Sequence, residues 1–169
     1  DLSLVDPDNR RPVDYRRRSD AIAKIRQGAE KDRKRLIKNL LKDPENGQIK
    51  LFLVWEALQL RNEFPDLFHK GDYRPISASG QKQRNAVAFA RTEGRNQVIS
   101  IGTLLPSRLV KTETLITGPD AWKDTMLRFP TGVEGNFRNR LTGREIKISR
   151  EHPIGEILNE LPVALLVKE

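Results

Sequence analysis

The hydrophobic pattern of this chain changes its period near Gly71, and that change limits the folds the chain can adopt. Before Gly71, apolar residues recur at the three- and four-residue spacing of amphipathic helices. After Gly71, the apolar runs are short and partly alternating, and turn signals such as Glu93-Gly94 separate them. We therefore expect an α+β protein, with a helical segment at residues 1–70 and an antiparallel β-sandwich at residues 71–169.

Three helices are expected in the N-terminal segment. The first runs from about Pro12 to Gln27, with Gly28 as its stop, and the second covers about residues 31–42. The third, residues 48–63, carries apolar residues around much of its circumference, so we expect it to be buried on two sides. One of its apolar stripes is formed by Ile49, Phe52, Leu53, Ala57 and Leu60.

The C-terminal segment predicts six to eight strands. The last apolar run, residues 163–167, is continuous, which is typical of a central strand with two buried faces. Between about residues 104 and 120, Pro106 and Gly118-Pro119 indicate a long excursion at one edge. The other clear strand signals are residues 76–78, 86–90, 98–101 and 144–148.

The polar stretch before the first helix has the character of a rigid loop. Pro7 fixes its own φ angle, while Asp8 and Asn9 favour turns. A carboxylate and a guanidinium in such a loop, as in Asp6 and Arg10, can hold two sugar hydroxyls, because one accepts and the other donates hydrogen bonds. A turn satisfied by its own surface ion pairs is the alternative.

The same loop carries a resemblance to a known family. Residues 6–10 have the Asp-Pro-x-x-Arg form found after barrel strand eight in the α-amylase superfamily, and residues 3–15 closely resemble the maltooligosyltrehalose synthases, or glucosylmutases. Further matches occur in the order of that family and cover essentially the whole chain. They are Trp55-Glu56-Ala57-Leu58, Phe64-Pro65-Asp66-Leu67-Phe68, Gly71-Asp72-Tyr73-Arg74-Pro75, Ala86-Val87-Ala88-Phe89-Ala90-Arg91, Trp122-Lys123-Asp124-Thr125 and Leu141-Thr142-Gly143.

The resemblance implies the end of a TIM-type barrel followed by the C-terminal sandwich of an intramolecular transglucosylase. Such an enzyme converts the reducing-end α-1,4 linkage of malto-oligosaccharides into an α,α-1,1 linkage, without a cofactor. The resemblance places Asp6 and Arg10, and less directly Asn9 and Arg11, at the sugar. The three catalytic carboxylates come from earlier barrel strands, so we expect this chain to be an inactive piece of a larger protein. Its partners would be its own N-terminal catalytic barrel and the malto-oligosaccharide.

Other kinds of chemistry find little support in the residues. The chain has no Cys and only two histidines, His69 and His152, which are far apart, so neither a metal site nor a His-based catalytic site is expected. Asp6 and Asp8 are close enough to suggest a pair of glycosidase carboxylates, but nothing near this Pro-rich turn would bury one of them to raise its pKa. No signal peptide and no membrane span are apparent, and we expect a cytoplasmic protein.

Two functions of other classes remain as alternatives. The net charge of +8 lies largely in residues 1–50, with clusters at residues 16–18 and 33–35, which a nucleic-acid-binding domain would also show. Interspersed acidic residues and few aromatics favour a solvated helix face, and we expect no nucleic-acid partner. A free-standing carbohydrate-binding sandwich would expose aromatic rings. Its candidates are Tyr73, Phe89, Trp122, Phe129 and Phe137, with Trp122 first, although a core role is favoured for Trp122.

Overall fold

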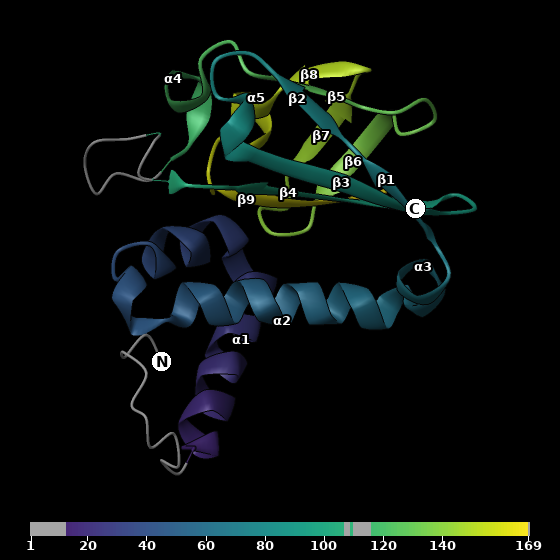
Figure 1. The fold of residues 1–169 in the computed structure, drawn as a ribbon. Coiled ribbons are helices and arrows are strands. Elements are labelled where there is room, and N and C mark those ends of the chain that lie inside the picture. The colour runs from purple at the N-terminus through teal and green to yellow at the C-terminus, as the bar shows by residue number, and fades with distance from the viewer. Residues whose placement is uncertain (1–12, 107–108, 110–115, 169) are drawn as a thin grey trace, which may run out of the picture. The chain divides into compact units, whose positions relative to one another are not determined.

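A computed structural model describes residues 13–106, 109 and 116–168 of the chain (Figure 1). Internal contacts divide the chain into two compact units, Asp1–Leu60 and Arg61–Glu169. The sequence predicted a boundary near residue 70 between the end of a catalytic barrel and a C-terminal sandwich. That boundary stays a prediction. Among the described residues, no helix is long and apolar enough to cross a membrane.

The first unit contains the long helix α1 (Tyr15–Leu40), which is broken once. Asp14 caps its start, because the Asp14 side chain accepts a hydrogen bond from the Arg17 N–H at 2.9 Å. At Asp32 the backbone leaves the helical region, with φ −160° and ψ 90°, and the Asp32 carboxylate accepts a bond from the Arg35 N–H at 3.0 Å. Asp32 therefore acts as a new helix cap in the middle of α1.

The predicted stop at Gly28 was wrong. Gly28 lies inside the first half of α1, and the break falls at Asp32. A side-chain carbon built on Gly28 would lie 3.0 Å from the Leu36 Cδ1 atom. The glycine thus makes room for a side chain from the second half of α1, a packing role that looks the same as a stop signal in the sequence.

Helix α2 (Gln48–Glu63) has the predicted bounds. It follows the short 3-10 helix η1 (Pro44–Asn46), and the Asn46 Oδ1 atom accepts a bond from the Gln48 N–H at 2.8 Å. Phe52, Glu56 and Leu60 form a single fully buried row at four-residue spacing. Other apolar positions stay partly open, and Leu58 is 54% exposed. In this chain α2 is therefore buried along one row rather than on two sides.

The second unit contains two antiparallel sheets, which confirms the expected sandwich (Figure 1). The larger sheet has the order β1-β3-β4-β9-β6-β7 and the smaller has the order β2-β5-β8. Strand bounds are β1 Asp72–Pro75, β2 Ser77–Ser79, β3 Ala86–Glu93, β4 Asn96–Thr103, β5 Met126–Arg128, β6 Gly135–Asn139, β7 Glu145–Ile148, β8 Glu151–Pro153 and β9 Val163–Lys168. Short helices precede or connect the strands: α3 Pro65–His69 comes before β1, and η2 Gln83–Asn85, α4 Gly118–Trp122 and α5 Ile154–Ile157 lie between strands.

One hydrophobic core joins the two sheets. It includes Ile99 and Ile101 of β4, Leu127 of β5, Leu166 of β9 and the fully buried Trp122 of α4. In Figure 1, β2, β5 and β8 lie above this core and β3, β4 and β9 below it. The sheets thus bury their facing sides against each other, as a sandwich requires.

The predicted strands are present, and β9 lies between β4 and β6, which confirms its central position. The nine described strands exceed the expected six to eight. The additional ones are only three to five residues long, and β1, β6 and β8 among them are largely polar. In the excursion expected at residues 104–120, α4 occupies its C-terminal end, while residues 107–108 and 110–115 lie outside the described range.

Candidate functional site

The four residues predicted to contact sugar, Asp6, Asn9, Arg10 and Arg11, lie outside the described residues. Their assignment stays a prediction. The structure does describe the helix to which this loop leads, which begins at Tyr15 and is capped by Asp14. Asp8, the other carboxylate of the loop, also lies outside the described range.

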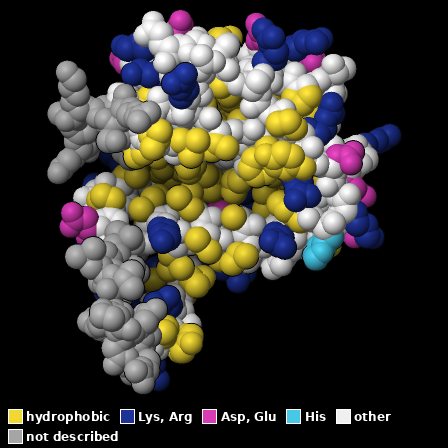
Figure 2. Space-filling view, viewed as in Figure 1, with side chains coloured by type: hydrophobic (Ala, Val, Ile, Leu, Met, Phe, Trp, Pro, Cys, Tyr) yellow, Lys and Arg dark blue, Asp and Glu magenta, His cyan; other side chains and the backbone are white. Residues whose placement is uncertain are grey.

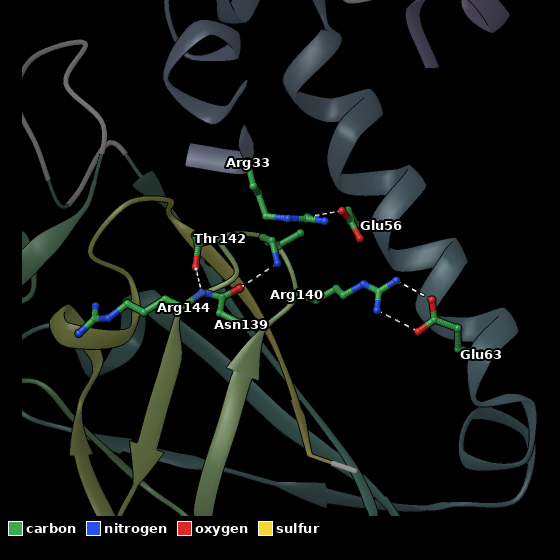
Figure 3. Close-up of polar contacts among 8 residues, drawn as sticks. Arg33, Glu56, Glu63, Asn139, Arg140, Thr142 and Arg144 are labelled. Atoms are coloured by element: carbon green, nitrogen blue, oxygen red, sulfur yellow. Dashed lines mark hydrogen bonds and ion pairs between the residues drawn. The ribbon is translucent and has the colours of Figure 1, made fainter. Parts of the chain in front are cut away.

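A charged pair is buried in the first unit. Arg33 of α1 donates through its Nη1 atom to the Glu56 Oε1 atom of α2 (Figure 3). The Glu56 side chain is 1% exposed and that of Arg33 is 24% exposed. The Arg33 guanidinium also lies 6.0 Å from the centre of the Phe52 ring, a cation–π distance. Because the carboxylate is enclosed and already binds a guanidinium, the pair holds α1 to α2 rather than offering a proton to a substrate.

Sequence reasoning missed this pair. Glu56 was noted as part of a family match, and its burial was not foreseen. The available signal was its position, because Glu56 lies midway between the apolar Phe52 and Leu60 at helical spacing. A charge inside an apolar row predicts a buried partner.

A second set of polar contacts lies at the turn between β6 and β7 (Figure 3). The Arg140 guanidinium donates two hydrogen bonds to the Glu63 carboxylate, from Nη1 to Oε2 at 2.9 Å and from Nη2 to Oε1 at 2.5 Å. The Asn139 side chain accepts from the Leu141 N–H at 3.0 Å, and the Thr142 hydroxyl accepts from the Arg144 N–H at 3.3 Å. These side chains are used to fix the turn, so the cluster is a structural one.

The two histidines do not come together. His69 is exposed at the end of α3, whereas His152 lies on β8 with its side chain only 12% exposed. Burial lowers the pKa of His152 below 6.5, Glu156 opposes this shift and Arg144 adds to it. The His152 Nε2 atom lies 3.4 Å from Glu156 Oε2. This distance allows an ion pair but the atoms lack hydrogen-bond geometry, so the contact is weak.

No metal site is formed by the part of the chain that the structure describes. Within it, no group of three or more His, Cys, Asp or Glu side chains converges. The structure places His152 in strand β8, with its side chain largely buried. A single largely buried imidazole beside one carboxylate and one guanidinium does not by itself make up a catalytic centre.

The aromatic residues divide into core and surface members. Trp122, Phe129 and Phe137 are buried and belong to the core of the sandwich, which confirms the core role favoured for Trp122. Tyr73 is 58% exposed, and its ring stacks on Phe89. Of the five rings considered for sugar binding, only these two can meet a ligand at the surface.

The basic residues of α1 lie on a solvated face. Arg16, Arg17 and Arg18 are exposed, and Arg26 pairs with Glu30 at 3.1 Å one turn further on. On the face seen in Figure 2, Lys and Arg side chains are dispersed among polar and apolar groups instead of forming one continuous patch. This distribution is typical of a solvated helical surface.

Comparison with known proteins finds matches along the entire chain. The solved structure of the maltooligosyltrehalose synthase of Arthrobacter ramosus matches 100% of the chain with a TM-score of 0.70 and 32% sequence identity, and a mutant of it gives the same values. A protein of Mycobacterium tuberculosis, provisionally named a maltooligosyl trehalose synthase in two strains, is 33% identical over 169 residues. No protein-family model matches the sequence.

The chain spans 17% of the length of these curated relatives and 19% of the Arthrobacter protein. Its helical segment and antiparallel sandwich are therefore homologous to one part of a much longer enzyme. The solved relative is named a maltooligosyltrehalose synthase, and the chain matches its C-terminal part.

Proposed function

We propose that the chain is the C-terminal part of an intramolecular transglucosylase of the maltooligosyltrehalose synthase type. The whole enzyme would cleave the reducing-end α-1,4 linkage of a malto-oligosaccharide and rejoin the released glucose through an α,α-1,1 linkage. The observation that carries this proposal is similarity over the full 169 residues to proteins with this name.

The arrangement of the described residues agrees with a supporting role. Retaining transfer needs a nucleophile carboxylate and an acid/base carboxylate about 5 Å apart. Two of the described carboxylates that have close partners, Glu56 and Glu63, are instead each held by an arginine. The catalytic carboxylates would therefore come from barrel strands that precede this chain in the full enzyme.

Within that enzyme, the loop before α1 would reach the active site. We assign Asp6 and Arg10 to hydrogen bonds with a glucose unit near the cleaved bond, with Asn9 and Arg11 as additional contacts. An aspartate accepts and an arginine donates, so the pair can orient neighbouring hydroxyl groups without taking part in bond cleavage.

The test compares the 169-residue chain with the natural full-length protein that contains it. Each is incubated with maltopentaose, and the products are separated by chromatography against a heat-killed control. We expect a trehalose-ended product from the full-length protein and none from the chain alone. Product from the chain alone would show that it has its own catalytic residues. A full-length protein that makes no such product would refute the assignment to this reaction.

A further inference from the structure

Two aromatic rings form an exposed pair at the edge of the six-stranded sheet. Tyr73 belongs to β1, the edge strand, and Phe89 belongs to its neighbour β3. Their ring centres are 5.0 Å apart with an angle of 28° between the planes, and Tyr73 is 58% exposed. The Tyr73 ring is thus supported on one side by Phe89 and partly open to solvent.

The strand register fixes the face on which this pair lies. Ala88 and Ala90 of β3 belong to the core. Because side chains alternate between the two faces of a strand, Phe89 and Arg91 lie on the outer face of the sheet. Tyr73 is directly opposite Arg91 in the β1–β3 register and is therefore diagonal to Phe89. The stacked rings consequently lie outside the core.

The start of β1 is held in place by two close contacts. The Arg91 Nη1 atom donates to the Gly71 carbonyl oxygen at 3.0 Å. A side-chain carbon at Gly71 would lie 2.3 Å from the Leu67 carbonyl oxygen, so only glycine allows the backbone to approach this closely. Strand β1, the Phe89 ring and the Arg91 guanidinium are all held in place before a ligand binds. Binding of a ligand to Tyr73 therefore costs little free energy for ordering the protein surface.

The groups around the rings suit a neutral polyhydroxylated ligand. Arg91 lies on the same face as Tyr73, and its guanidinium has five N–H donors in a planar arrangement that can serve two adjacent hydroxyl groups. Ser100 of β4 is directly opposite Phe89 and adds a hydroxyl group on that face. A sugar ring has an apolar C–H face that can lie on Tyr73 and hydroxyl groups at its rim that can bond to such donors.

We propose that Tyr73, Phe89 and Arg91 form a surface binding site for a linear α-1,4-glucan, separate from the loop that carries Asp6 and Arg10. The exposed ring and its donors suit a sugar, and the choice of an α-1,4-glucan rests on the function proposed above. The site binds weakly, through one stacked sugar ring and its edge contacts. It would hold a long malto-oligosaccharide to the protein away from the position of bond cleavage.

The first experiment is native gel electrophoresis of the 169-residue chain with and without soluble amylose in the gel. The wild-type chain should be slowed by amylose, and Tyr73→Phe, which keeps the ring, should be slowed similarly. Tyr73→Ala should bind maltoheptaose about tenfold more weakly, which corresponds to about 1.4 kcal/mol. Tyr15→Ala serves as the matched control, because Tyr15 is also exposed but lies on α1. Thermal unfolding confirms that each variant is folded.

The second measurement needs no variant. Adding maltoheptaose to the isotopically labelled wild-type chain should shift the NMR signals of the Tyr73, Phe89 and Arg91 amides first. Shifts confined to other parts of the chain would overturn the site. So would a wild-type chain that amylose does not slow, or a folded Tyr73→Ala that is slowed like wild type. Equal slowing by dextran would overturn the choice of α-1,4-glucan. These results do not depend on the maltopentaose product assay, so either proposal can fail without the other.

Discussion

Separating the buried Arg33–Glu56 pair should destabilise the protein by an amount that depends on which partner is removed. Arg33→Met removes the cation from a carboxylate whose side chain is 1% exposed. Breaking a buried ion pair in this way costs about 3–5 kcal/mol. Glu56→Leu leaves a guanidinium that is already 24% exposed and can turn further toward water on its long stem. We therefore expect a smaller loss there, of about 1–3 kcal/mol.

The double variant Arg33→Met/Glu56→Leu separates the pair's contribution from that of the side chains themselves. It should be more stable than Arg33→Met alone, because replacing a whole buried pair by apolar groups is often close to neutral. The measurement is chemical denaturation followed by far-ultraviolet circular dichroism. Arg26→Met is the matched control, because its partner Glu30 is exposed and such pairs contribute little.

Two results would refute this reasoning. Losses as small as that of Arg26→Met would mean that water reaches the pair in solution. A larger loss for Glu56→Leu than for Arg33→Met would mean that the guanidinium, rather than the carboxylate, is the group that cannot be left without its partner. Either result would show that the exposed fractions do not govern the energy of the pair.

Three further predictions concern the loop, α2 and β8. In the full-length enzyme, Arg10→Ala should lower kcat/KM by the equivalent of about 1.5–3 kcal/mol with little change in thermal stability, whereas normal kinetics with a large stability loss would make Arg10 a purely structural residue. In the isolated chain, Leu60→Ala should lower the free energy of unfolding by about 2–5 kcal/mol, whereas Leu58→Ala, at a position 54% exposed, should lower it much less. Similar large losses for both variants, in a chain shown to be monomeric by light scattering, would contradict the exposure of Leu58 on α2. Because burial lowers the pKa of His152, the unfolded state takes up a proton before the folded state does, so stability should be highest above pH 6.5 and should fall as the pH drops below it. Between pH 7.5 and 5.5, the free energy of unfolding measured by denaturation should decline less steeply for His152→Gln than for wild type. Parallel declines would show that His152 does not cause the loss of stability at low pH.

Local sequence signals predicted the elements whose pattern is strong over several residues. Residues 48–63 form one helix because η1 and Asn46 mark its start and because its interior lacks glycine and proline. Residues 163–167 form a central strand because they can be buried on both faces. In both cases the local preference and the tertiary environment favour the same structure.

Where the prediction failed, the cause lies in contacts between distant residues. Gly28 is required by Leu36, and Glu56 is stable inside its row only because Arg33 reaches it from another helix. Strand β8 is short and partly polar, and its pairing with β5 decides its conformation. The stacking of Tyr73 on Phe89 likewise follows from the register of two strands, which the sequence of either strand alone does not specify.

The central position of β9 has a consequence for how the sandwich forms during synthesis. β9 is the last of the described strands along the chain, yet it joins β1-β3-β4 on one side to β6-β7 on the other. Until residues 163–168 emerge from the ribosome, the larger sheet can exist only as two separate pieces, each with an unpaired strand edge. A nascent chain halted before β9 would present the edges of β4 and β6 to other chains. We therefore expect chaperone dependence and aggregation to be greatest in the moments before β9 is released.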